Sequence, residues 1–173
     1  MKKIIFMALL TLPFLFSMTT SHAEEALGEN IMTRKERIKE AFNNLRADNL
    51  HILDNFYHPK LKFKDPLGEI SGLKEMKAYY AKMYENVTDI RFDFSSLSEE
   101  GEDIFATWNM VLKAKSLNGG DEVQVTGVSH LKFDTESNLV IYHRDYFDMG
   151  AFIYEYVPVL GSIIRMIKRK LGH

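Results

Sequence analysis

Four long strand-like stretches follow one another in the second half of the chain, and they limit the possible folds more than any other feature of the sequence. They cover residues 88–97, 102–115, 122–134 and 138–148. The segments between them, SEEGED, LNGGDE and DTESN, are short and rich in turn-forming residues. Because parallel neighbours need a crossover of about a dozen residues or more, such short connections predict antiparallel pairs. The pattern therefore predicts an antiparallel sheet of long strands.

The segments before these strands show helical periodicity. TRKERIKEAFNNLRA places its apolar residues on one face, and Thr33 and Glu36 have the spacing of a capping box. DNLHILDNFY predicts a shorter helix with Asp48 as its N-cap, and LKEMKAYYAKMYENV predicts a third helix that begins at Leu73. Between these two helices, KLKFKD alternates with a period of two and predicts a half-buried strand, which is followed by the Pro-Gly turn DPLGEISG.

Helices in the first half and strands in the second predict an α+β fold. An antiparallel sheet commonly buries one face, and the three predicted N-terminal helices are available to cover it. A long curved sheet that folds around helices leaves a cone-shaped hollow between the two layers. We therefore expect one domain over residues 33–150.

Residues 1–23 combine a basic start, the apolar run IIFMALLTLPFLFSM and the small-residue site SHA. This pattern is typical of a secretory signal with cleavage after Ala23, and the run is too short to predict a membrane span. We therefore expect a periplasmic or secreted protein. Export would leave 20 basic residues against 24 acidic ones, a balance that does not predict nucleic acid as a partner.

The tail, residues 151–173, predicts a helical segment with a break between Pro158 and Gly161. Apolar residues of the last part form one stripe, and basic residues lie on the other sides of the helix. Such a helix either packs on its own domain or on a second subunit, or lies on an anionic membrane surface.

Asp65 ends the predicted strand KLKFKD, and alternation turns it to the same side as Leu61 and Phe63, which is the inner side. A carboxylate there needs hydrogen bonds or a cation to compensate for lost hydration. Two interpretations remain open at this position. Asp65 either takes part in chemistry inside the hollow or, since it precedes Pro66, accepts backbone hydrogen bonds in the turn.

The stretch YHRDYFDMG, residues 142–150, gathers ionisable groups among aromatic residues. On a strand, His143 and Asp145 point to the same side, close enough for one to orient the other or to share a proton. The alternative is an Asp145 paired with a cation of a neighbouring strand, beside a structural His143. Ser129 and His130 do not form a catalytic pair, because neighbours on a strand point to opposite faces, and we expect His130 on the outer face.

Trp108 is the only tryptophan and alternates with Met110 on the inward face of its strand. It is either part of the core or a platform for an apolar ligand, with its N–H as a polar group that can bind the ligand.

The chain has no cysteine, which excludes disulfides and thiolate zinc sites. Because His51 and His58 are a weak ligand pair, we expect neither a metal nor a cofactor.

FKDPLGEISGLKEMKAYY and GVSHLKFDTESNLVIYHRDYFD, in this order of elements, resemble the SnoaL-like branch of the NTF2-like (nuclear transport factor 2-like) superfamily over about residues 33–150. The resemblance implies a cone-shaped α+β barrel with an apolar pocket, often in a homodimer. Its members include ketosteroid isomerases, polyketide cyclases and epoxide hydrolases, alongside binding modules without known activity.

The RDYFD motif is similar to that of limonene epoxide hydrolases, and this similarity implies a catalytic role for Asp145. His143 stands where those enzymes have a pocket Trp. Their paired Arg and Asp on the preceding long strand correspond to Trp108 and Met110 here, so the residues for epoxide hydrolysis by that mechanism are missing. Tyr57 or Tyr80 could supply a phenol of the kind that the isomerases use.

Together these observations predict an acid–base isomerase, cyclase or hydrolase for a small apolar ligand, without a cofactor. The expected catalytic residues are Asp145, His143 and Asp65, and the expected ligand-binding residues are Trp108, Met110, Phe63, Tyr80 and Phe147. The alternatives are a non-catalytic binding module of the cell envelope and a scaffold at the membrane.

Overall fold

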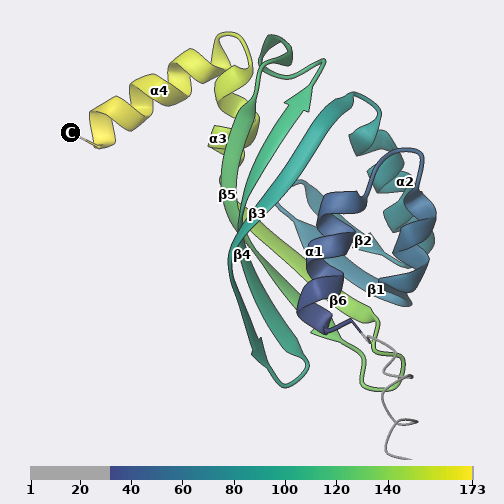
Figure 1. The fold of residues 1–173 in the computed structure, drawn as a ribbon. Coiled ribbons are helices and arrows are strands. Elements are labelled where there is room, and N and C mark those ends of the chain that lie inside the picture. The colour runs from purple at the N-terminus through teal and green to yellow at the C-terminus, as the bar shows by residue number, and fades with distance from the viewer. Residues whose placement is uncertain (1–31, 173) are drawn as a thin grey trace, which may run out of the picture. The chain divides into compact units, whose positions relative to one another are not determined.

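A six-stranded sheet with the strand order β2-β1-β6-β5-β4-β3 organises residues 32–172, the part of the chain that the computed structural model describes (Figure 1). The predicted signal segment lies outside the described residues. The strands are β1 (Tyr57–Asp65), β2 (Gly68–Ser71), β3 (Val87–Glu100), β4 (Asp103–Ala114), β5 (Val123–Phe133) and β6 (Val140–Phe147). The helices are α1 (Arg34–Asn44), η1 (Leu50–Asn55), α2 (Leu73–Tyr84), η2 (Asn118–Gly120), α3 (Met149–Phe152), η3 (Tyr154–Tyr156) and α4 (Leu160–Leu171).

The four long strands β3 to β6 pair antiparallel in sequence order, as predicted. The sheet as a whole is mixed rather than wholly antiparallel, because β1 pairs with β6 in parallel. The reason is the crossover of α2, which carries the chain from β2 at one edge of the sheet to β3 at the other edge. Because β2 and β3 then run in the same direction, β1 meets β6 in parallel.

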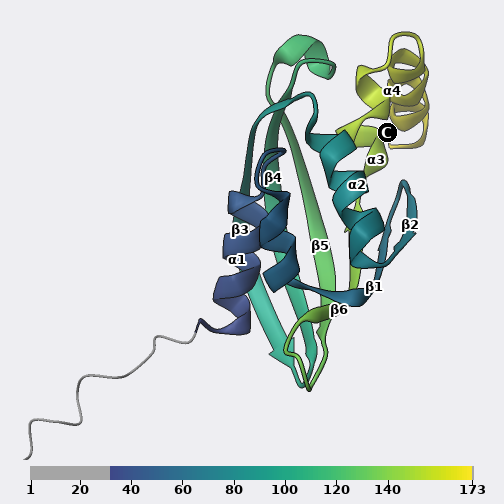
Figure 2. The same ribbon diagram turned by 90° about the vertical axis from the view of Figure 1, so that its right-hand side faces the viewer.

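Three helical elements precede β3, and α1 and α2 cover the same face of the sheet (Figure 2). Helix α1 packs against β3, and α2 packs against β1. The predicted capping box is present. The Glu36 backbone N–H donates a hydrogen bond to the Thr33 hydroxyl, and the Thr33 backbone N–H donates one to the Glu36 carboxylate. The second helix differs from the prediction, because η1 is a 3₁₀ helix whose N-cap is Asn49 rather than Asp48.

The segment predicted as a turn after β1 also forms the short strand β2, which pairs antiparallel with β1 from Gly68 to Ser71. The side chain of Asp65 closes the connecting turn, because its Oδ1 accepts from the backbone N–H of Leu67 at 2.8 Å and of Gly68 at 2.9 Å. This is the turn interpretation of Asp65, and it accounts for one of the two carboxylate oxygens.

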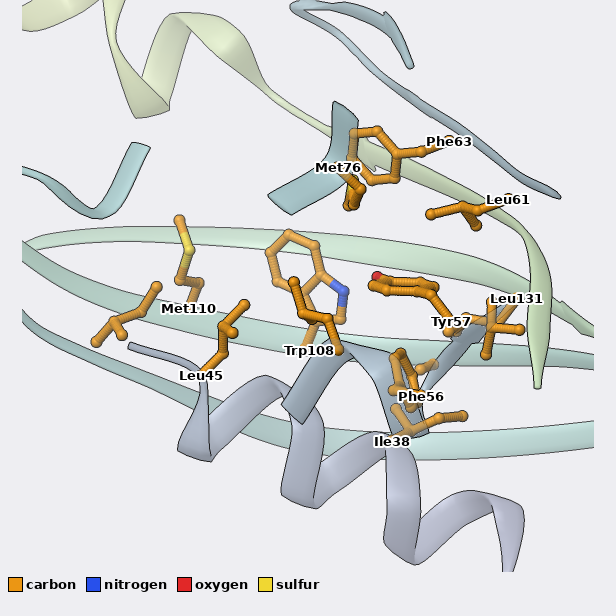
Figure 3. Packing of buried hydrophobic residues seen from close by; sticks show 14 of the residues in the cluster. Ile38, Leu45, Phe56, Tyr57, Leu61, Phe63, Met76, Trp108, Met110 and Leu131 are labelled. Atoms are coloured by element: carbon orange, nitrogen blue, oxygen red, sulfur yellow. The ribbon is translucent and has the colours of Figure 1, made fainter. Parts of the chain in front are cut away.

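The core lies between the helices and the covered face of the sheet (Figure 3). Inward residues of the central strands meet apolar side chains of α1, η1 and α2 there, among them Ile38, Leu53 and Met76, all of which are essentially inaccessible to solvent. Burial of large apolar side chains is the main source of stability in such a layer. None of the helices between residues 32 and 172 is long and apolar enough to span a membrane.

The C-terminal segment turns away from the sheet after β6. The predicted break is confirmed, since α4 begins at Leu160 after the short helices α3 and η3. Val159, just before α4, has φ +68°, and the Leu160 backbone N–H donates to the Pro158 carbonyl at 2.8 Å. The chain therefore reverses tightly before α4.

Candidate functional site

The carboxylate of Asp145 is the centre of a buried hydrogen-bond network. Strand β6 turns His143 and Asp145 to the inner face, and β5 brings Ser129 directly opposite Asp145. The Oδ1 atom of Asp145 lies 2.5 Å from Ser129 Oγ and 2.8 Å from His143 Nε2. No described residue donates a hydrogen bond to its Oδ2 atom, and the side chain keeps 16% of its surface exposed. Hydrogen bonds therefore hold Oδ1 in place, and Oδ2 stays available to accept a hydrogen bond or a proton.

His143 is fully buried, and its two ring nitrogens have different partners. Nδ1 lies 2.6 Å from the Tyr57 hydroxyl, and Nε2 faces Asp145. The pKa of Tyr57 is raised well above 10.0, first by burial and also by the charge of Asp145. The phenol therefore stays protonated and donates to Nδ1, which leaves the proton of a neutral imidazole on Nε2, pointing at Asp145.

The other arm of the network runs to Trp108. Its Nε1–H donates to Ser129 Oγ at 2.9 Å, and the Ser129 hydroxyl donates onward to Asp145. Figure 3 shows the indole nitrogen of Trp108 and the hydroxyl of Tyr57 turned toward one another, at the two ends of this network. The indole crosses Gly127, where a Cβ atom would overlap its six-membered ring. Gly127 thus lets Trp108 reach Ser129.

Asp65 lies on β1 next to this network. The parallel register pairs Phe63 with His143 and Lys64 with Arg144, so Asp65 and Asp145 occupy the next positions of adjacent strands. The Tyr79 hydroxyl of α2 donates to Asp65 Oδ2. Burial raises the pKa of Tyr79, and the nearby Asp65 and Asp145 raise it further. Two carboxylates and a protonated phenol therefore share one small region.

A pocket of about 360 Å³ opens beside the two carboxylates, past the end of β1. It is open to solvent rather than enclosed. Its lining consists of Lys64, Asp65, Pro66, Arg144, Asp145, Tyr146 and Phe147. The guanidinium of Arg144 lies 4.5 Å from the centre of the Tyr146 ring. The pocket therefore combines two carboxylates, two cations and aromatic surface.

The structure brings the predicted residues Asp65, His143 and Asp145 together and links Trp108 to them through Ser129. Asp65 and Asp145 line the pocket, whereas His143 supports Asp145 from behind.

The residues predicted to bind the ligand have a different placement. Phe147 lines the pocket. Trp108, Met110 and Phe63 belong to the core, and Tyr80 packs against it, so these four do not line that pocket. Large side chains from α1, η1 and α2 meet the sheet in the region where the sequence predicts an open hollow.

Sequence reasoning missed Ser129 and Tyr79. The inward direction of Ser129 could have been found, since it alternates with the core residues Leu131 and Phe133. His130 points to the outer face, as predicted, and its Nε2 lies 2.6 Å from Asp103 Oδ1. Among the described residues, no group of three or more His, Asp or Glu side chains could hold a metal ion.

The model of the SnoaL-like domain family matches residues 38–142, which is more than half of the chain. The chain belongs to the SnoaL-like family. Comparison of this SnoaL-like chain with curated proteins finds no match.

Solved structures share the fold of this SnoaL-like domain at low sequence identity. A protein from Shewanella denitrificans described as a SnoaL-like polyketide cyclase is 17% identical, with a TM-score of 0.60 over 69% of this chain and 93% of the other. An NTF2-like protein of unknown function from Burkholderia pseudomallei is 17% identical, with a TM-score of 0.58 over 78% and 97%.

A third structure contains a small bound molecule. A protein from Catenulispora acidiphila with a ketosteroid isomerase-like fold, in complex with trimethylamine, is 10% identical, with a TM-score of 0.60 over 71% of this chain and 90% of the other. At such identities these likenesses show that the SnoaL-like chain has the NTF2-like fold.

Proposed function

We propose that this SnoaL-like protein is a cofactor-independent acid–base enzyme of the isomerase, cyclase or hydrolase type, acting on a small, largely apolar molecule. The observation that supports this best is the asymmetric setting of Asp145. Ser129 and His143 hold its Oδ1, while Oδ2 is left without a donor beside a pocket. A general base needs this combination of fixed orientation and access.

In this proposal Asp145 removes a proton from carbon or from water, and His143 and Ser129 orient it. The cation of Arg144 lines the same pocket and is suited to stabilise a negative charge that develops on a substrate oxygen, whereas Lys64 is paired with Glu69. Asp65 accepts three hydrogen bonds, two in the turn and one from Tyr79, and shapes the pocket as a second carboxylate. Export forms part of the proposal, because residues 1–23 have the pattern of a secretory signal.

The test uses nitrobenzisoxazole, whose ring opens when a base removes one C–H proton, so that the natural substrate need not be known. Asp145→Asn should lower the rate at least about 100-fold, since general-base catalysis typically contributes that much. The matched control is Asp103→Asn, a carboxylate on the outer face of the same sheet that pairs with His130. Asp145→Asn at the wild-type rate, with an unchanged circular dichroism spectrum, would contradict the proposal.

A binding module without catalysis is the second candidate. It is favoured by Trp108 and Met110, which stand where similar epoxide hydrolases have a catalytic Arg and Asp and which lie in the core here. Native mass spectrometry of the purified protein distinguishes the two. The binding module is supported if the purified protein retains a tightly bound apolar molecule and does not open the ring of nitrobenzisoxazole.

A further inference from the structure

Helix α4 presents an uncovered apolar stripe to solvent. At 100° per residue, Ile163, Ile167 and Leu171 lie on one side of the helix, and they are 43%, 48% and 78% exposed. Most of the exposed large hydrophobic side chains between residues 32 and 172 lie in or just before this helix: Tyr154, Tyr156, Val157, Val159, Leu160, Ile163, Met166, Ile167 and Leu171. A contiguous patch of this kind marks an interaction surface.

Another side of α4 holds it to the short helix η3. The Arg165 guanidinium donates to the Glu155 carbonyl at 2.9 Å, and Lys168 Nζ lies 2.5 Å from Glu155 Oε1. Gly161 is buried, and a Cβ atom there would overlap the same carbonyl. These attachments leave the apolar stripe facing away from the domain, and Figure 1 shows α4 extending outward from the sheet.

The charge of α4 selects what can cover the stripe. The helix carries Arg165, Lys168, Arg169 and Lys170 and no acidic residue. Since the whole chain has a net charge of −2, the remainder of the chain carries −6, the difference between −2 and +4. Cationic charge is thus concentrated on the helix that carries the apolar stripe, whereas the rest of the chain is acidic. Two copies of α4 packed on one another would bring like charges together, whereas an anionic lipid surface complements them.

We propose that α4, with the segment Tyr154–Val159 before it, is a peripheral membrane-binding element that places its apolar stripe in the interface of an anionic bilayer. Amphipathic helices with basic residues beside an apolar face bind membranes in this way, through apolar burial and attraction to anionic lipid. The exposed Tyr154 and Tyr156 suit the polar–apolar boundary, where tyrosine is enriched.

Vesicle flotation tests this proposal on residues 32–173. This part is a compact unit that contains the whole described core, and it lacks the apolar run near the N-terminus, which could bind lipid by itself. The protein should float with vesicles of equal parts phosphatidylcholine and phosphatidylglycerol and stay behind with phosphatidylcholine alone. Binding should weaken as salt is added, because salt screens the attraction.

Two variants separate the apolar and the ionic contributions. Ile163→Glu with Ile167→Glu should abolish flotation. Arg169→Glu with Lys170→Glu should weaken binding at least roughly 30-fold, since each basic residue near an anionic surface contributes about fivefold. The matched control is Lys60→Glu with Lys62→Glu, which makes the same change in net charge at exposed positions of β1. It should bind as the wild type does.

Three outcomes overturn the proposal: no binding of the wild type to anionic vesicles, full binding by the isoleucine variant, and equal loss in the β1 control. Sedimentation of the same variants distinguishes a second copy of the chain as the occupant. A wild-type dimer that Ile163→Glu with Ile167→Glu turns into a monomer, without vesicle binding, would assign the stripe to self-association. The rate of the Asp145→Asn variant with nitrobenzisoxazole tests the proposed enzyme function separately, because it does not depend on whether α4 binds vesicles.

Discussion

Gly127 has no side chain at the point where the Trp108 indole crosses β5, and the position of Asp145 depends on this arrangement. The indole reaches Ser129 across the glycine, and Ser129 then holds one oxygen of the carboxylate. Ser129 is fully buried and satisfies the Trp108 N–H, so an unpaired donor inside the core is avoided. At the scale of single residues, the site is supported by packing as much as by polar groups.

We expect Gly127→Ala to lower the free energy of unfolding by about 1–3 kcal/mol, the usual cost of overpacking a tight core. The added methyl group must displace the indole, so the fluorescence of the single tryptophan should change in the folded protein. Urea denaturation followed by this fluorescence measures both effects. Gly68→Ala is the control, since a Cβ atom there meets nothing within 4 Å. Equal stability of the two variants would show that the indole does not need the gap.

At the scale of elements, the crossover of α2 and the seating of α4 decide what the strands and helices can do. The crossover makes β1 parallel to β6 and so places Asp65 beside Asp145. Helix α4 is held through contacts to η3 around the Glu155 carbonyl. One contact region therefore sets the direction in which the apolar stripe faces.

Gly161→Ala should release α4 from η3, because the new methyl group overlaps the Glu155 carbonyl. Amide hydrogen exchange should become faster throughout α4, while the amides of β4 and β5 keep their protection. Lys170→Ala, at an exposed position of the same helix, serves as the control. Unchanged protection of α4 in Gly161→Ala would mean that this contact does not hold the helix.

For the whole domain, tyrosines in the core or packed against it make stability depend on pH in the alkaline range. Burial raises the pKa of Tyr57, Tyr79 and Tyr80, and it raises the pKa of Tyr84 to about 12. The unfolded chain loses these protons near the ordinary pKa of about 10, whereas the folded chain keeps them. The unfolded state then binds fewer protons, so the stability that the neutral phenols provide is present below pH 10 and is lost above it.

We expect the free energy of unfolding to fall above about pH 10 by up to about 1.4 kcal/mol per pH unit for each such tyrosine. Tyr84→Phe should remove one tyrosine's share of this slope between pH 10 and the pKa of about 12. Urea denaturation at a series of pH values measures the slope, with Tyr154→Phe, an exposed position, as the control. A slope that does not change in Tyr84→Phe contradicts the assignment.

Local patterns in the sequence were enough to predict the capping box at Thr33, the four long strands, the inward direction of Asp65, His143, Asp145 and Trp108, and the break before α4. These features depend on neighbours in the chain, through a period of two or 3.6 residues, and can be read without knowing the fold. The RDYFD motif additionally pointed to the family, which the family model confirms.

The tertiary structure decided which of these inward residues meet. Alternation places Ser129 on the inner face but does not say that it lies opposite Asp145, and nothing local makes β1 parallel to β6. Whether the inner space is filled by Trp108 and its neighbours or left open also depends on all the helices at once. Side-chain direction is a property of a few consecutive residues, whereas strand pairing and packing are set by residues far apart in the chain, and so only the folded molecule determines them.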